Sequence, residues 1–133
     1  MCGRYALMEY VKKEGSHSVE TILQRLTELD EVHNAILVGK DGLLVSGILH
    51  SEDEEVIGAM SAATFGSIGD YTSQVSSSDT RHVIIETKNG TIQMEEAGDL
   101  ILVVTTHGVG NLGRVRLEMK KACRQLVQMV ASY

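Results

Sequence analysis

The chain has 133 residues, a formal net charge of −6 and no proline, and hydrophobic residues make up 43% of it. This length and composition are typical of one soluble globular domain. The negative balance disfavours nucleic acid or an anionic membrane as a partner, because both present negative charge that needs a basic surface. No apolar run is long enough to span a membrane, and the N-terminus lacks an apolar signal core. We therefore expect a cytoplasmic protein with no nucleic-acid or membrane partner.

The cysteines and histidines show no spacing typical of a metal site. Cys2 and Cys123 lie at opposite ends of the chain, so we interpret them as reduced thiols and not as a disulfide framework or a metal-ligand set. The five histidines have no zinc-ligand spacing such as H-x3-H. They are His17, His33, His50, His82 and His107. We predict no metal and no cofactor.

The N-terminal half predicts an arm, a helix and a hairpin. Residues 1–15 have no clean period and are expected to form an N-terminal arm before a domain over 16–133. Apolar residues at helical spacing predict a helix over 18–29 with Ser18 as its N-cap. Two apolar runs, residues 35–38 and 43–45, flank an Asp-Gly turn signal and predict a hairpin that is covered on both faces or central in a sheet.

A long helix is predicted next, over 52–75, where Ser51 and Glu54 match a capping box. Three strands joined by short turns follow it. They are expected at 82–87, 91–97 and 100–104. A final apolar stripe predicts a helix over 112–130.

The order of elements is helix, strand, strand, helix, strand, strand, strand, helix. Five strands linked mainly by hairpins predict an α/β domain of the α+β type, with one five-stranded antiparallel sheet and helices on both faces. The first and last helices are expected on one face and the middle helix on the other. Within residues 91–97, Ile92 and Met94 alternate with Gln93 and Glu95, which predicts a half-exposed strand.

The middle helix has two contrasting sides. Bulky residues on one side are expected to lie on the sheet: Val56, Ile57, Met60, Thr64, Ile68, Tyr71 and Val75. Small residues gather on the other side: Gly58, Ala59, Ala62, Ala63, Gly66 and Gly69. Glycine costs about 1 kcal/mol relative to alanine in an exposed helix, and small residues let two helices approach closely. We predict that the small side forms a homodimer interface about a two-fold axis; burial beneath another element of the same chain is the alternative.

Three stretches carry a likeness to a known family. They are the hairpin AILVGKDGLLV at 35–45, the small-residue AMSAA at 59–63, and NLGRVRLEM at 111–119. Together they resemble the Roadblock/dynein light-chain family, including its bacterial and archaeal GTPase-regulator branch, over residues 18–130. The resemblance implies a Roadblock/profilin-like sandwich and a homodimer with facing middle helices and joined sheets. It also implies docking onto a Ras-like small GTPase or a larger assembly. Arg114 and Arg116 lie near the start of the last predicted helix and are candidates for contact with such a partner.

A glycine-rich segment at 108–113 matches G-x-G-x-x-G between a strand and a helix, which is the context of a dinucleotide fingerprint. No further strand with an acidic residue for the ribose follows Gly113, so a mononucleotide-binding half cannot be completed. We interpret the segment as a loop in which Asn111 caps the last helix.

The opening residues, 1–7, resemble the start of a peptidase-like family that traps abasic DNA, in which Cys2 becomes N-terminal. That family uses tryptophan and proline motifs, and this chain has neither residue. We predict a non-enzymatic scaffold or regulator in signalling, with no catalytic residue. A purely structural light-chain-type tether and an enzyme that uses Cys2 are the alternatives.

Overall fold

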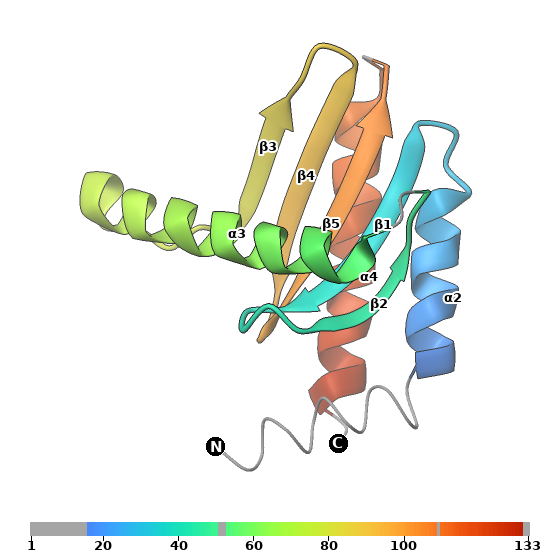
Figure 1. Ribbon diagram of the computed structural model, residues 1–133, viewed down its shortest axis with the longest axis horizontal. Coiled ribbons are helices and arrows are strands. Elements are labelled where there is room, and N and C mark those ends of the chain that lie inside the picture. Colours follow the sequence, from blue (N-terminus) through green and yellow to red (C-terminus); the bar gives the residue numbers. More distant parts are fainter. Residues whose placement is uncertain (1–15, 51–52, 109, 132–133) are drawn as a thin grey trace.

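The computed structural model of the protein describes residues 16–50, 53–108 and 110–131. Over these residues three helices pack on a five-stranded antiparallel sheet (Figure 1). The helices are α2 (Ser16–Thr27), α3 (Glu54–Ser76) and α4 (Leu112–Ala131). The strands are β1 (Val32–Gly39), β2 (Leu44–Ile48), β3 (His82–Glu86), β4 (Gly90–Ala97) and β5 (Leu100–His107). The predicted fold class and order of elements are confirmed.

The strands lie in the order β2-β1-β5-β4-β3, so β5 is the central strand and β1 is an inner strand beside it. Both are nearly continuous apolar runs, as expected of strands that are covered on both faces. Alternate residues of β1 enter two separate cores, with Ala35 and Leu37 in one and Ile36 and Val38 in the other. The hydrophobic pattern of these two strands therefore fixes the middle layer of the domain.

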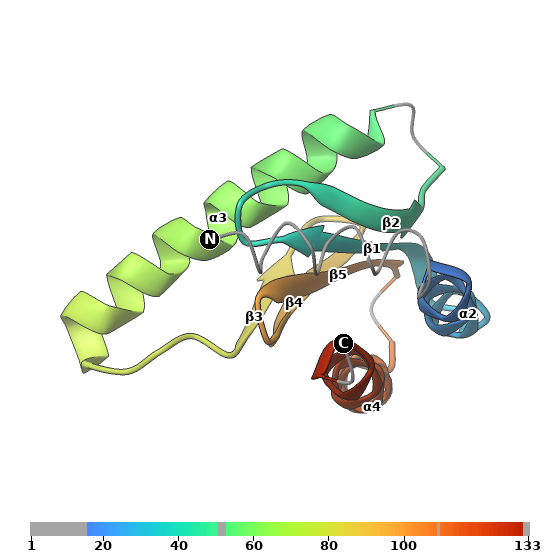
Figure 2. The same ribbon diagram turned by 90° about the horizontal axis from the view of Figure 1, so that it is seen from below.

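The helices divide between the two faces of the sheet as predicted. The larger core joins α2 and α4 to the sheet, and the smaller core lies under α3. Figure 2 shows α3 on one side of the strands and both α2 and α4 on the other. The domain thus has a one-helix face and a two-helix face.

The starts of α2 and α3 each differ from their predictions by two residues. α2 begins at Ser16, so Ser18 lies inside the helix and is not its N-cap. Asp53 occupies the N-cap position of α3, and its side chain makes no capping hydrogen bond. Ser51, the predicted cap, lies outside the described residues, as do the N-terminal arm and Cys2.

The orientation of α3 differs from the prediction. Its buried residues are the small and aromatic ones on a single side: Gly58, Ser61, Ala62 and Phe65. The residues expected on the sheet instead include four that are more than half exposed: Val56 (54%), Met60 (63%), Tyr71 (66%) and Val75 (66%). The prediction that the bulky stripe lies on the sheet was therefore wrong, and so was the placement of Gly58 and Ala62 on the open side.

Close approach between α3 and the sheet explains this orientation. A Cβ atom built on Gly58 would lie 3.4 Å from Val38 Cγ2 and 3.5 Å from Leu44 Cδ1. Only a small residue lets the helix backbone sit this close to β1 and β2, because protein interiors are already close-packed. The structure thus shows the alternative stated above for Gly58 and Ala62, which is burial against another element of the same chain.

We predict that Gly58→Leu lowers the free energy of unfolding by about 1–3 kcal/mol, because the new side chain must displace Val38 or lift α3 from the sheet. Gly66→Leu is the matched control on the same helix, since a Cβ atom there meets nothing within 4 Å. Urea unfolding of both variants measures the difference. Equal losses of stability would contradict the orientation of α3.

Candidate interaction surface

The outward side of α3 is the main candidate for an interaction surface. We call it the outer α3 face and define it by exposed residues at helical spacing: Val56, Ala59, Met60, Ala63, Ser67 and Tyr71. From Val56 to Ser76 the only charged residue is Asp70. A solvated helix face normally carries many charged residues, and a soluble monomer rarely exposes a continuous apolar patch. The outer α3 face therefore has the composition of a surface that another molecule covers.

The structure divides the predicted interface residues between two environments. Ala59, Ala63 and Gly66 are exposed, whereas Gly58 and Ala62 are buried against the sheet. Gly66 and the half-buried Gly69 border a groove of about 470 Å3 that Phe65 and Ile101 also line. Sequence reasoning missed Val56, Met60 and Tyr71 as outward residues, because both sides of α3 are apolar and only side-chain size distinguishes them.

The C-terminal end of α3 and the edge of the sheet lie together. In Figures 1 and 2 this end of the helix runs past β3 and overhangs the sheet edge. β3 pairs with β4 alone, so its other edge has no strand partner among the described residues. Ile84, at the centre of β3, is 40% exposed. An open strand edge is a template for pairing with another chain, and the overhanging helix could cover a strand added there.

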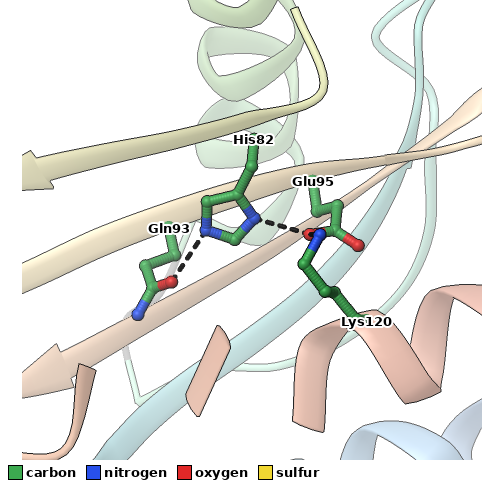
Figure 3. A network of polar contacts seen from close by, with 4 residues as sticks. All are labelled: His82, Gln93, Glu95 and Lys120. Atoms are coloured by element: carbon green, nitrogen blue, oxygen red, sulfur yellow. Dashed lines mark hydrogen bonds and ion pairs between the residues drawn. The ribbon is translucent and has the colours of Figure 1, made fainter. Parts of the chain in front are cut away.

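A second feature is a buried polar network on the α4 side of the sheet (Figure 3). His82 of β3 lies between two residues of β4, with Nδ1 2.6 Å from Glu95 Oε1 and Nε2 2.8 Å from Gln93 Oε1. Lys120 Nζ reaches from α4 to within 3.7 Å of the same Glu95 oxygen. Gln93 is fully buried and Glu95 is 7% exposed. The prediction that β4 is half-exposed was therefore wrong, because α4 covers its polar side.

The hydrogen bonds of this network depend on the state of His82. As the side chains lie, both ring nitrogens face oxygen atoms, so both donate only when the ring is protonated. Gln93 Nε2 has no hydrogen-bond partner among the described residues. Turning the Gln93 amide over would let Nε2 donate to a neutral ring, because amide orientation is assigned from hydrogen bonding. In both arrangements Nδ1 can donate to Glu95.

The network shifts the pKa values of two groups, Glu95 and Cys123, in opposite directions. Burial alone would raise the pKa of Glu95, but the hydrogen bond from His82 and the charge of Lys120 outweigh it and hold that pKa below its ordinary value of 4.5. Burial, together with the neighbouring Glu95 charge, raises the pKa of Cys123 to about 12. This thiol is therefore protonated at neutral pH and is a poor nucleophile.

Three of the histidines meet at one end of the sheet, although they are distant in sequence. The rings of His33 and His50 stack with centroids 4.6 Å apart, and the ring of His107 lies edge-on at 5.9 Å from His33. Stacked rings point their nitrogens in parallel and not at one common atom. In the part of the chain that the structure describes, no group of three or more histidine, cysteine or acidic residues is placed to hold a metal ion.

The glycine-rich loop leads into α4 through Asn111. Its carbonyl accepts from Val115 N at 3.1 Å, as an N-cap residue does. Its backbone is left-handed, with φ of 60°, and its side chain donates to Glu31 Oε1 at 2.7 Å. The Asn111 side chain therefore joins α4 to the turn before β1 instead of capping the helix. Its hydrogen bond is the main cause that lowers the pKa of Glu31.

Arg114 and Arg116 are both exposed near the start of α4. The charge of Arg114 contributes to the lowered pKa of Glu31. They are free to meet another molecule and stay candidates for partner contact. They lie on the two-helix face, away from the outer α3 face.

We predict that Glu95 stabilises the fold in a pH-dependent way. Because its folded pKa is lowered, this contribution is present above about pH 4.5 and is lost as the pH falls through the folded pKa. Glu95→Gln should lower the free energy of unfolding by about 1–2 kcal/mol at pH 7. The difference from the wild type should shrink between pH 5 and pH 3 (roughly the range of carboxyl titration). Urea unfolding across this range measures it, and a constant difference would contradict the role of the Glu95 charge.

Comparison with known proteins agrees with this architecture. A family model described as the Roadblock/LC7 domain matches residues 18–106. The uncharacterized protein MJ0714 of Methanocaldococcus jannaschii is 36% identical over 112 residues, which cover 84% of this chain and 95% of that protein. Its counterpart MJ1340, from the same organism, is 33% identical and is covered over 98% of its length, against 84% of this chain.

Solved structures share the fold at lower identity. MglB of Myxococcus xanthus superposes with a TM-score of 0.83 at 24% identity, covering 90% of this chain and 92% of that one. Profilin IB of Acanthamoeba castellanii gives 0.62 at 13% identity, covering 82% and 96%. None of the helices in the described residues is long and apolar enough to cross a membrane. From the family model and its M. jannaschii relatives, the chain belongs to the Roadblock/LC7 family.

Proposed function

We propose that the protein is a non-catalytic homodimer that binds a Ras-like small GTPase and regulates it. The observation that carries the dimer is the outer α3 face, which is exposed and almost without charge. The GTPase partner rests on the family. Its GTPase-regulator branch, which the sequence resembles, acts on small GTPases, and the fold is shared with MglB proteins.

The dimer would use two adjoining features. The outer α3 face supplies apolar area from residues such as Met60 and Tyr71. The open edge of β3 supplies backbone groups that a second β3 strand could pair with about a two-fold axis. The part of α3 that overhangs this edge would then lie over the partner's sheet. Ala59 and Ala63, from the predicted small-residue side, would allow the two helices to approach closely.

A regulator needs no reactive group of its own, since it can act by favouring one conformation of its partner. This agrees with the buried Cys123, whose thiol is protonated at neutral pH. Arg114 and Arg116 are exposed and could contact the partner. A structural tether within a larger assembly is the second candidate. A tether would also be a dimer, but its binding would not depend on whether a partner GTPase holds GTP or GDP. One solved MglB structure is described as a tetrameric arrangement.

We predict that Met60→Glu and Tyr71→Glu convert the dimer to a monomer of about 14.5 kDa in light scattering. Each substitution places a charge in a surface that dimerisation would desolvate, which is costly without a partner charge. Leu117→Glu is the control, because Leu117 is similarly exposed (51%) but lies on α4. A wild-type chain that stays monomeric at high concentration, or variants that stay dimeric, would rule out this face as the interface.

The GTPase partner is tested by capture and by turnover. A Ras-like GTPase encoded in the same genome, loaded with either a non-hydrolysable GTP analogue or GDP, is passed over the immobilised protein. We expect capture to depend on the nucleotide and the GTP hydrolysis rate to change when the protein is added. Nucleotide-independent capture would favour the tether, and absence of capture would contradict this choice of partner.

A further inference from the structure

The α4 side of the sheet holds a cleft that the proposed dimer does not use. It has a volume of about 560 Å3 and lies beside the C-terminal half of α4, where β3 begins and β4 ends. Its lining combines basic, acidic and apolar groups: Arg81, Glu95, Glu96, Lys120, Arg124 and Val127, with Cys123 and Gln128. The outer α3 face lies on the opposite side of the sheet, so both surfaces can be open at once.

Positive charge is concentrated around this cleft although the chain as a whole is acidic. α4 alone carries five of the twelve basic residues and a single acidic one, Glu118. Two of those five, Lys120 and Arg124, line the cleft, and Arg81 joins them from the start of β3. An isolated basic patch on an acidic protein attracts acidic partners to that one place.

The acidic residues in the lining already have partners within the chain. Glu95 is held by His82 at 2.6 Å and by Lys120 at 3.7 Å. Glu96 pairs with Lys40 at 2.6 Å. Among the described residues, no ion pair or side-chain hydrogen bond engages Arg81 or Arg124, and both are exposed. The two guanidinium groups are therefore the uncompensated charges of the cleft.

We propose that this cleft binds an acidic segment of a partner protein, with its carboxylates on Arg81 and Arg124. A guanidinium group presents paired N–H donors that match the two oxygens of a carboxylate. Carboxylates spaced along an extended chain can reach the two arginines separately. Val127, which is 41% exposed, also lines the cleft and offers apolar contact to such a chain.

The proposal does not depend on the GTPase. It predicts that a short fluorescent oligo-glutamate peptide binds the full-length protein, with an affinity that falls as salt is added. Fluorescence anisotropy measures the dissociation constant. Arg81→Glu and Arg124→Glu should each weaken binding by about tenfold or more, since a charge-assisted pair is replaced by repulsion. Arg81→Gln and Arg124→Gln should give smaller losses, and circular dichroism confirms that each variant is folded.

Lys121→Glu is the matched control, because it makes the same change of charge on α4 outside the cleft. It should alter the affinity by about twofold or less. Amide NMR shifts on adding the peptide should centre on Lys120, Cys123 and Val127. Equal weakening by all three charge reversals would overturn the proposal in favour of diffuse attraction to α4. Binding to phosphatidylserine vesicles or to inorganic phosphate, without binding to the peptide, would also overturn it.

Discussion

The contact between α3 and the sheet determines which residues of the helix other molecules can meet. Gly58 has no side chain, so the helix backbone settles against Val38 and Leu44, and Ala62 and Phe65 follow it into the same core. Since a helix has only one face toward its sheet, this seating turns Met60 and Tyr71 outward. Gly58 and Ala62 thus act within one chain, and through that contact they expose the apolar surface that a second copy could cover.

The two faces of the sheet differ in chemistry as well as in the number of helices. On the α3 side the outer α3 face is nearly uncharged, whereas on the other side α4 is strongly basic. The polar network beneath α4 accounts for two features of that side, the links between its elements and the unpaired arginines of the cleft. His82 and Lys120 hold the buried Glu95, and these contacts tie β3, β4 and α4 together. It also leaves Arg81 and Arg124 without acidic partners at the cleft.

The strands, the order of elements and the division of helices between faces could be predicted, because each depends on local periodicity and turn residues. The orientation of α3 could not, since both sides of that helix are apolar and the choice depends on how closely Val38 and Leu44 approach it. The burial of Gln93 and Glu95 was also missed. Alternation in β4 indicates two unlike sides but cannot show that α4 supplies a partner for the polar one. The cleft, like the meeting of His33, His50 and His107, joins residues distant in sequence.

A dimer built through the outer α3 face and the edge of β3 would have consequences for the basic cleft. Pairing about a two-fold axis would leave the α4 side of the joined sheet free of contact with the partner subunit. The dimer would then present two basic clefts, one on each subunit. Because each cleft begins at Arg81, immediately before β3, both would lie near the shared edge. A partner with two acidic segments could then bind both, and its affinity would rise with the effective concentration that the dimer creates. Dimerisation and recognition of an acidic partner use opposite faces of the sheet. They would be linked by β3, because this strand forms the dimer edge and begins beside the cleft.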